Sequence, residues 1–115
     1  MSEFRVRSKV WLEYRGLPLL GGGRFRLLTA LEESGSINAT ARTLGISFRK
    51  AWSQLQSMEE HSPFPLFERR AGGKGGGATL LTPEARRLLQ QFRQLREQVH
   101  READLAFEEH FATWL

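Results

Sequence analysis

Residues 36–61 decide the fold, and their sequence is SINATARTLGISFRKAWSQLQSMEEH. Apolar residues recur at helical spacing on both sides of Gly45, and a serine that can cap a helix precedes each run. Gly45 ends the first run, and two prolines shortly after residue 61 forbid the second run to continue. The pattern therefore predicts two helices, over 37–44 and 48–61, joined by a tight turn.

Two helices joined by a short glycine turn meet at a steep angle, so small residues must lie where the backbones approach. Ala41 and Gly45 occupy those positions. The apolar packing behind them is expected from Ile37, Leu44, Ile46, Ala51 and Leu55. This arrangement is typical of a helix-turn-helix unit, although helical hairpins unrelated to DNA share parts of it.

The helix predicted over 48–61 has two unlike sides on a helical wheel. We interpret Trp52 and Met58 as core residues, on an apolar side made of Phe48, Ala51, Trp52, Leu55 and Met58. The opposite side carries Arg49, Lys50, Ser53, Gln56 and Ser57. Such side chains can donate to guanine edges or phosphates, so this side is free to enter the major groove of DNA. For Phe48, at the flank, we expect packing, with contact to a thymine methyl group as the alternative.

Two further elements are expected before this unit. Phe4–Glu13 alternates apolar and polar residues at first, which predicts a half-buried or edge strand. Glycine and proline within 16–23 interrupt the pattern and predict a loop. Apolar residues then recur at helical spacing over 24–33, so a short amphipathic helix should end at Ser34-Gly35.

Residues 66–70 and 78–81 are short strand-like runs on either side of a glycine-rich tip, AGGKGGG, and they predict a β-hairpin. Arg69, Arg70 and Lys74 would lie on this hairpin as a wing that reaches backbone phosphates. A flexible turn without such a role is the alternative. The tip lacks the spacing of a Walker phosphate loop, which excludes a nucleotide site there.

A strong helix start follows at Thr82-Pro83-Glu84, with a capping hydroxyl, a proline at the first position and an acid at the positive end of the dipole. Apolar residues then recur at spacings of three and four over about 25 residues. This stripe predicts a dimer seam, and burial against the chain's own domain is the alternative. The predicted dimerisation residues are Leu88, Phe92, Leu95 and Val99.

These elements predict a mainly α fold with a small β component: a winged helix-turn-helix with a long C-terminal dimerisation helix. A length of 115 residues suits a single domain. We expect an N-terminal strand and loop in 1–21, the helix-turn-helix and wing in 22–81, and the dimerisation helix with an acidic tail in 82–115.

Charge is distributed unevenly along the chain. Residues 1–96 contain 16 of the 17 Lys and Arg but eight of the 13 acids, whereas 97–115 contain one Arg and five acids. Fourteen of the basic residues are Arg, which suits phosphate and guanine contacts, although a merely solvated surface is the alternative. We predict DNA contacts from Ser36, Arg42, Ser47, Phe48, Arg49, Lys50, Ser53, Gln54, Arg69, Arg70 and Lys74.

Several classes of protein are excluded by composition. There is no cysteine, so disulfide scaffolds, zinc ribbons and thiol nucleophiles are ruled out, and a reducing cytoplasm fits. The three histidines lie far apart, and His100 with Asp104 lacks a third ligand, so we expect neither a metal, a cofactor nor an enzyme. No apolar stretch approaches the roughly 18 residues of a membrane span, so we expect no membrane association.

Four runs of the sequence carry a family resemblance. Three are short: Gly35-Ser36-Ile37, Gly45 to Trp52, and Leu81-Thr82. The fourth is the wing, Phe67-Glu68-Arg69 to Gly72-Gly73-Lys74-Gly75-Gly76-Gly77-Ala78. They resemble the N-terminal DNA-binding domain of the ModE family of molybdate-responsive regulators, over roughly residues 22–100. The helix-turn-helix and the Leu-Thr-Pro helix start are also similar to the broader LysR-type regulators.

This resemblance implies a homodimer that binds double-stranded DNA, with Ser47 to Gln54 in the major groove and Lys74 on the backbone. It also implies control of molybdate uptake or molybdenum-enzyme genes. ModE proteins that sense molybdate carry C-terminal oxyanion-binding domains, whereas this sequence ends at Leu115. We therefore expect sensing to involve a separate molybdate-binding protein that meets the acidic tail. The alternatives are a protein-interaction module built on the same fold and, less favoured, oxyanion binding by Lys74 and its glycines.

Overall fold

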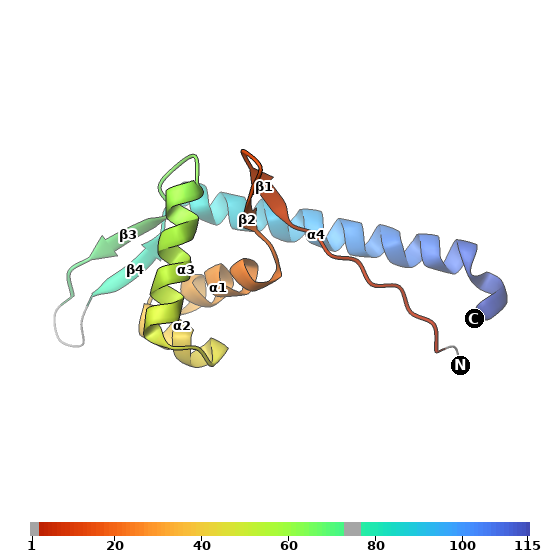
Figure 1. Cartoon of the computed structure of the whole chain (residues 1–115), viewed down its shortest axis with the longest axis horizontal. Coiled ribbons are helices and arrows are strands. Elements are labelled where there is room, and N and C mark those ends of the chain that lie inside the picture. Colours follow the sequence, from red (N-terminus) through yellow and green to blue (C-terminus); the bar gives the residue numbers. More distant parts are fainter. Residues whose placement is uncertain (1–2, 73–76) are drawn as a thin grey trace.

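The computed structural model describes residues 3–72 and 77–115. Its elements are β1 (Leu12–Tyr14), β2 (Leu17–Leu20), α1 (Gly22–Ser34), α2 (Ile37–Leu44), α3 (Phe48–His61), β3 (Phe67–Arg70), β4 (Ala78–Leu81), α4 (Pro83–His110) and a 3₁₀ turn, η1 (Ala112–Trp114). Helices α1 to α3 gather at one end of the molecule with the β3–β4 hairpin beside α3, and α4 extends away from them (Figure 1). The winged helix-turn-helix with a long C-terminal helix is therefore confirmed.

The helix boundaries follow from local signals that the sequence analysis identified. Ser36, Ser47 and Thr82 each accept a hydrogen bond at their hydroxyl from the backbone N–H three residues later, at 3.0–3.1 Å. Gly45 ends α2 in the left-handed conformation, with φ 67°. Apart from the glycine itself and its two chain neighbours, no atom of the described residues lies within 4 Å of the position that a Cβ would take there. The expectation that Gly45 admits a close backbone approach is therefore wrong, and its backbone angle is what requires glycine.

The core lies where α1, α2, α3, the wing and the first turns of α4 meet. Ala41, at the crossing of α2 and α3, is buried as predicted, and so are Ala51 and Leu55 of α3. Thr40 is fully buried, and its hydroxyl donates to the carbonyl of Ser36 at 2.8 Å, so this polar group is paired inside the turn. The helix-turn-helix and the wing therefore pack against the same hydrophobic core.

The N-terminal region corrects two expectations. Residues 3–11 form no strand, and the segment expected to be a loop contains β2, which pairs with β1 in an antiparallel hairpin. The hairpin turns at Arg15 and Gly16, which both have positive φ, as a tight two-residue turn requires. Burial of Leu19 and Leu20 in the core explains why this segment pairs although it contains a proline.

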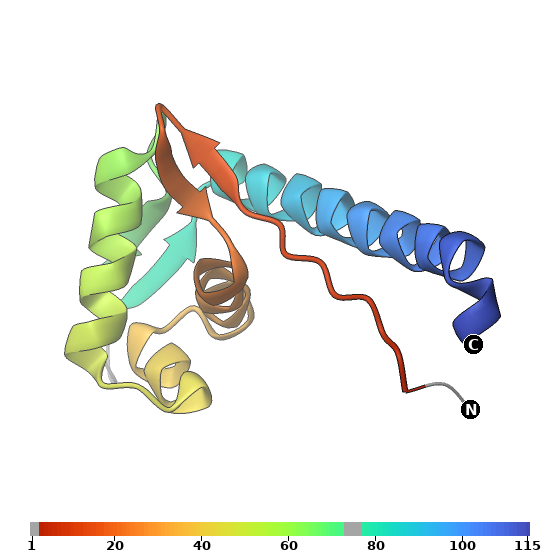
Figure 2. The same ribbon diagram turned by 45° about the vertical axis from the view of Figure 1, so that its right-hand side comes forward.

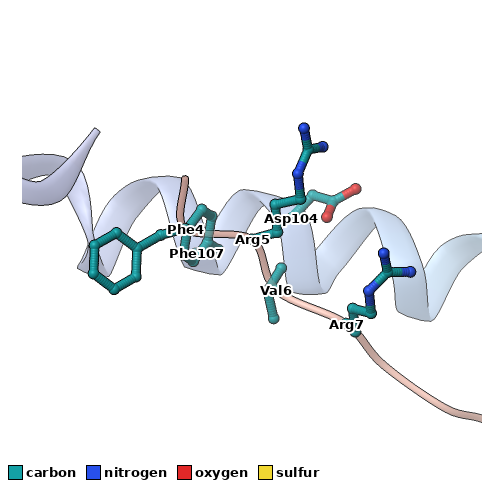
Figure 3. Close-up of a pocket in the computed structure, with 6 residues that line it drawn as sticks. All are labelled: Phe4, Arg5, Val6, Arg7, Asp104 and Phe107. Carbon is teal, nitrogen blue, oxygen red and sulfur yellow. The ribbon is translucent and has the colours of Figure 1, made fainter. Parts of the chain in front are cut away.

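Helix α4 is packed at its beginning and stands off the body beyond it (Figure 2). Phe92 is 2% exposed and its ring lies 5.5 Å from that of Phe25, whereas Leu95 is 44% exposed. The extended N-terminal residues run along the far half of α4, where Phe4, Val6, Asp104 and Phe107 line a shallow hollow together with Arg5 and Arg7 (Figure 3). Among the described residues, no helix is long and apolar enough to cross a membrane.

Candidate nucleic-acid interface

Helix α3 presents a polar and cationic face away from the core. Ala51, Leu55 and Met58 are buried, and they define the side of the helix that packs. Arg49, Lys50 and Ser53 are exposed. The division of this helix into a core side and a free polar side is therefore as predicted for these residues.

The two aromatic residues of α3 depart from the sequence interpretation. Trp52 is 40% exposed and Phe48 is 49% exposed, so the assignment of Trp52 to the core is wrong and Phe48 is not enclosed by packing. At about 100° per residue, Trp52 lies roughly 90° from the centre of the side that carries Ala51, Leu55 and Met58. The helical wheel grouped these residues by their hydropathy. Burial depends instead on which side chains of α3 the neighbouring elements cover.

The wing is joined to α3 through a carboxylate that the sequence analysis did not single out. Glu59 Oε2 accepts hydrogen bonds from the backbone N–H groups of Leu66 and Phe67, at 3.1 and 3.0 Å. At the base of the hairpin, the hydroxyl of Thr82 after β4 donates to the carbonyl of Pro65 in the loop before β3, at 2.7 Å. No sequence signal would have revealed the role of Glu59, since its partners are seven and eight residues away across a turn.

The first strand of the wing carries two of the predicted phosphate-binding residues. Arg69 and Arg70 are exposed on β3, and Arg69 Nη2 donates to Oε1 of Gln56 on α3 at 3.1 Å. Arg70 Nη2 lies 4.0 Å from Glu68, and both side chains face solvent. Lys74, the third basic residue predicted for the wing, lies outside the described residues.

A hollow of about 270 Å³ separates the wing from the helix-turn-helix. Its lining includes Ser36 at the start of α2, Phe48 at the start of α3, and both arginines of the wing. The backbone N–H of Thr79 donates to the carbonyl of Gly35 at 2.9 Å and holds β4 against this corner. The fold therefore brings four of the predicted DNA-contacting residues to one concave, cationic surface.

The other predicted contact residues lie on α2 and α3, outside the lining of this hollow. Arg42 is exposed in the last turn of α2. Ser47 is exposed at the cap of α3, with its hydroxyl oxygen engaged by the N–H of Lys50. Gln54 is half-buried on the edge of α3 away from Trp52. Contact of any of these residues with DNA remains a prediction.

The predicted dimerisation residues of α4 divide into two groups. Phe92 belongs to the core of its own domain, as the alternative for this helix supposed, and has no area left for a seam. Leu95 is exposed, and Leu88 and Val99 are half-buried. Leu105 adds exposed apolar surface further along the same helix.

Among the described residues, no group of three metal-binding side chains occurs.

Comparison with known proteins places this architecture in a family. The family model "Bacterial regulatory helix-turn-helix protein, lysR family" matches residues 23–86, from α1 into the first turn of α4. The chain is 48% identical over 69 residues to the transcriptional regulator ModE of Haemophilus influenzae, which covers 60% of this chain and 27% of that protein.

Two further relatives give the same result. The molybdenum transport protein ModE of Azotobacter vinelandii is 39% identical over 95 residues, 83% of this chain and 35% of the relative. The DNA-binding transcriptional dual regulator ModE of Escherichia coli is 42% identical over 69 residues, 60% of this chain and 26% of the relative. The chain thus spans about a quarter to a third of the length of these curated relatives. The resemblance to ModE proteins is confirmed, and the chain belongs to the lysR family of bacterial regulatory helix-turn-helix proteins.

Proposed function

We propose that this protein is a sequence-specific, double-stranded DNA-binding transcriptional regulator that acts as a homodimer in the cytoplasm. The observation that carries the proposal is the exposed cationic face of α3 beside a wing that holds two further arginines. Arg49 and Lys50 lie in the first turn of α3, the part of a recognition helix that enters the major groove. A role in binding and regulation, rather than catalysis, agrees with the names of the relatives.

The wing and α3 divide the work in this proposal. Arg49, Lys50 and Ser53 read base edges in the groove, and each specific base contact contributes on the order of 1–3 kcal/mol of discrimination. Arg69 and Arg70 neutralise phosphates beside the groove, which strengthens binding to every sequence and makes it sensitive to salt. The hydrogen bond from Arg69 to Gln56 connects the wing to α3 and favours one orientation of the wing relative to that helix.

Homodimerisation through α4 completes the proposal. The helix stands off its own domain, and the exposed Leu95 and Leu105 leave apolar surface that a second copy can cover. A symmetric pair of recognition helices would read a palindrome whose half-sites lie about one helical turn apart, roughly 34–36 Å. We therefore expect the operator to be palindromic.

We further propose that the regulated genes serve molybdate transport or molybdenum enzymes. Support comes from the relatives, whose names include transcriptional regulators and molybdenum transport proteins called ModE. The aligned part of this chain covers 27%, 35% and 26% of three of these relatives. We also propose a separate molybdate-sensing protein as the partner that supplies the signal.

The direct test is recovery of DNA crosslinked to the tagged protein across the genome, with and without molybdate in the medium. Enrichment at palindromes upstream of molybdate-transport genes would support the full proposal. Enrichment elsewhere would keep the DNA-binding regulator and remove the molybdenum link. If no DNA is enriched and the purified protein also fails to bind random duplexes at low salt, the DNA-binding function is refuted.

The second candidate function is a winged-helix module that recruits a protein partner through α4. It is favoured by the far end of this helix, where Phe111, Trp114 and Leu115 are exposed next to the acidic residues of the tail. Recovery of one stoichiometric partner by the tagged protein, together with absence of any enriched DNA, would favour this candidate. Loss of that partner on replacing Trp114 by alanine would locate the contact.

A further inference from the structure

Helix α3 carries an aromatic flank that its role in holding the core does not explain. Phe48 and Trp52 are one helical turn apart, and they are the two large apolar side chains of α3 that are exposed. The core side of the helix is filled by smaller residues that are fully buried. Both aromatic side chains are 40% or more exposed on a side of the helix that is otherwise polar. Burying them would contribute favourable free energy, and another molecule that covered them would provide that burial.

The contacts of the neighbouring residues show where this flank points. Phe48 lines the hollow in front of Arg69 and Arg70 of the wing. Gln56, one turn after Trp52, accepts the hydrogen bond of Arg69. Residues spaced four apart share one side of a helix, so Trp52 lies between two positions that face the wing. It therefore stands in the corner between the recognition helix and the wing, beside Arg49 on the groove-facing side.

The chemistry of this corner selects one kind of ligand group. Phosphates require donors, which the wing arginines supply, and a bare aromatic surface gives them little. Within the major groove the one apolar group on base edges is the C5 methyl of thymine, and apolar side chains discriminate thymine by packing on it. Resting on the DNA-binding function proposed above, we propose that Trp52, with Phe48, determines operator specificity by packing on thymine methyl groups.

The test removes the methyl groups from the DNA. The operator is first selected from a pool of random-sequence duplexes bound by the full chain. Each thymine of a half-site is then replaced singly by deoxyuridine, which lacks only the methyl, and affinities are compared by fluorescence anisotropy at fixed salt. For the wild-type protein, we expect at least one replacement per half-site to weaken binding about fourfold, the effect of one methyl withdrawn from an apolar contact.

The matching protein variant identifies the residue responsible. Trp52→Ala should bind the thymine and deoxyuridine duplexes equally at the sensitive position, because the contact is already absent. Trp11→Ala removes another exposed tryptophan, outside α3 and the wing, and should keep the fourfold difference. Circular dichroism spectra of both variants check that the fold is retained.

The outcomes separate this proposal from the function on which it depends. If the pool yields no preferred duplex, the DNA-binding function itself fails. If a sequence is selected but no deoxyuridine replacement changes wild-type affinity, the thymine contact is refuted while the regulator stands. If the sensitivity persists unchanged in Trp52→Ala and also in Phe48→Ala, another part of the protein reads the methyl and the proposal is overturned.

Discussion

Replacing Glu59 by alanine should destabilise the folded protein by about 2–4 kcal/mol. The change leaves the backbone N–H groups of Leu66 and Phe67 without their acceptor, which now lies 3.1 and 3.0 Å from them. An unpaired buried N–H costs about 1–3 kcal/mol, and because both hydrogen bonds are only partly buried we take the lower part of that range for each. Glu59→Gln keeps one acceptor oxygen, replaces the other by an NH2 group and loses the charge, so about 1 kcal/mol is expected.

The measurement is urea unfolding followed by circular dichroism at one protein concentration, because the stability of the proposed dimer would depend on concentration. Glu60→Ala is the matched control, since Glu60 is the exposed neighbour on the same helix, and its free energy of unfolding should stay within about 0.5 kcal/mol of wild type. Equal stability of Glu59→Ala and Glu60→Ala would refute the reasoning that this carboxylate joins the wing to α3.

Three further changes test the interface, the cap of α4 and the dimer. Arg49→Ala should weaken operator binding by about 1–3 kcal/mol, measured by titration of labelled duplex, whereas Arg26→Ala on α1 should leave the affinity unchanged. Equal losses of affinity in the two variants would show that Arg49 does not read a base. Thr82→Ala should lower the free energy of unfolding by about 2 kcal/mol, because this hydroxyl both caps α4 and donates to the loop before β3. A loss below about 0.5 kcal/mol in urea unfolding would contradict that double role. Leu95→Glu should give a monomer by sedimentation velocity at concentrations where Gln94→Glu remains dimeric, and two identical profiles would place the seam elsewhere.

The sequence was sufficient for the helices because their signals are local. A capping hydroxyl three residues before its N–H partner, a glycine at a left-handed position and a proline at a first turn are all visible within a few residues. The exposed cationic first turn of α3 was predictable for the same reason. The N-terminal hairpin was missed because pairing of β1 with β2 depends on Leu19 and Leu20 being buried by helices that follow them in the chain.

What the sequence alone determined is the order of the elements from α1 onward, the limits of α2 and α3, and the face of α3 that carries charge. These depend on backbone hydrogen bonds between residues three and four apart. The tertiary structure decided the attachment of the wing through Glu59, the exposure of Trp52 and the burial of Phe92 away from any seam. Burial depends on which distant segments cover a side chain, and helical periodicity reports a side chain's direction without showing what lies there.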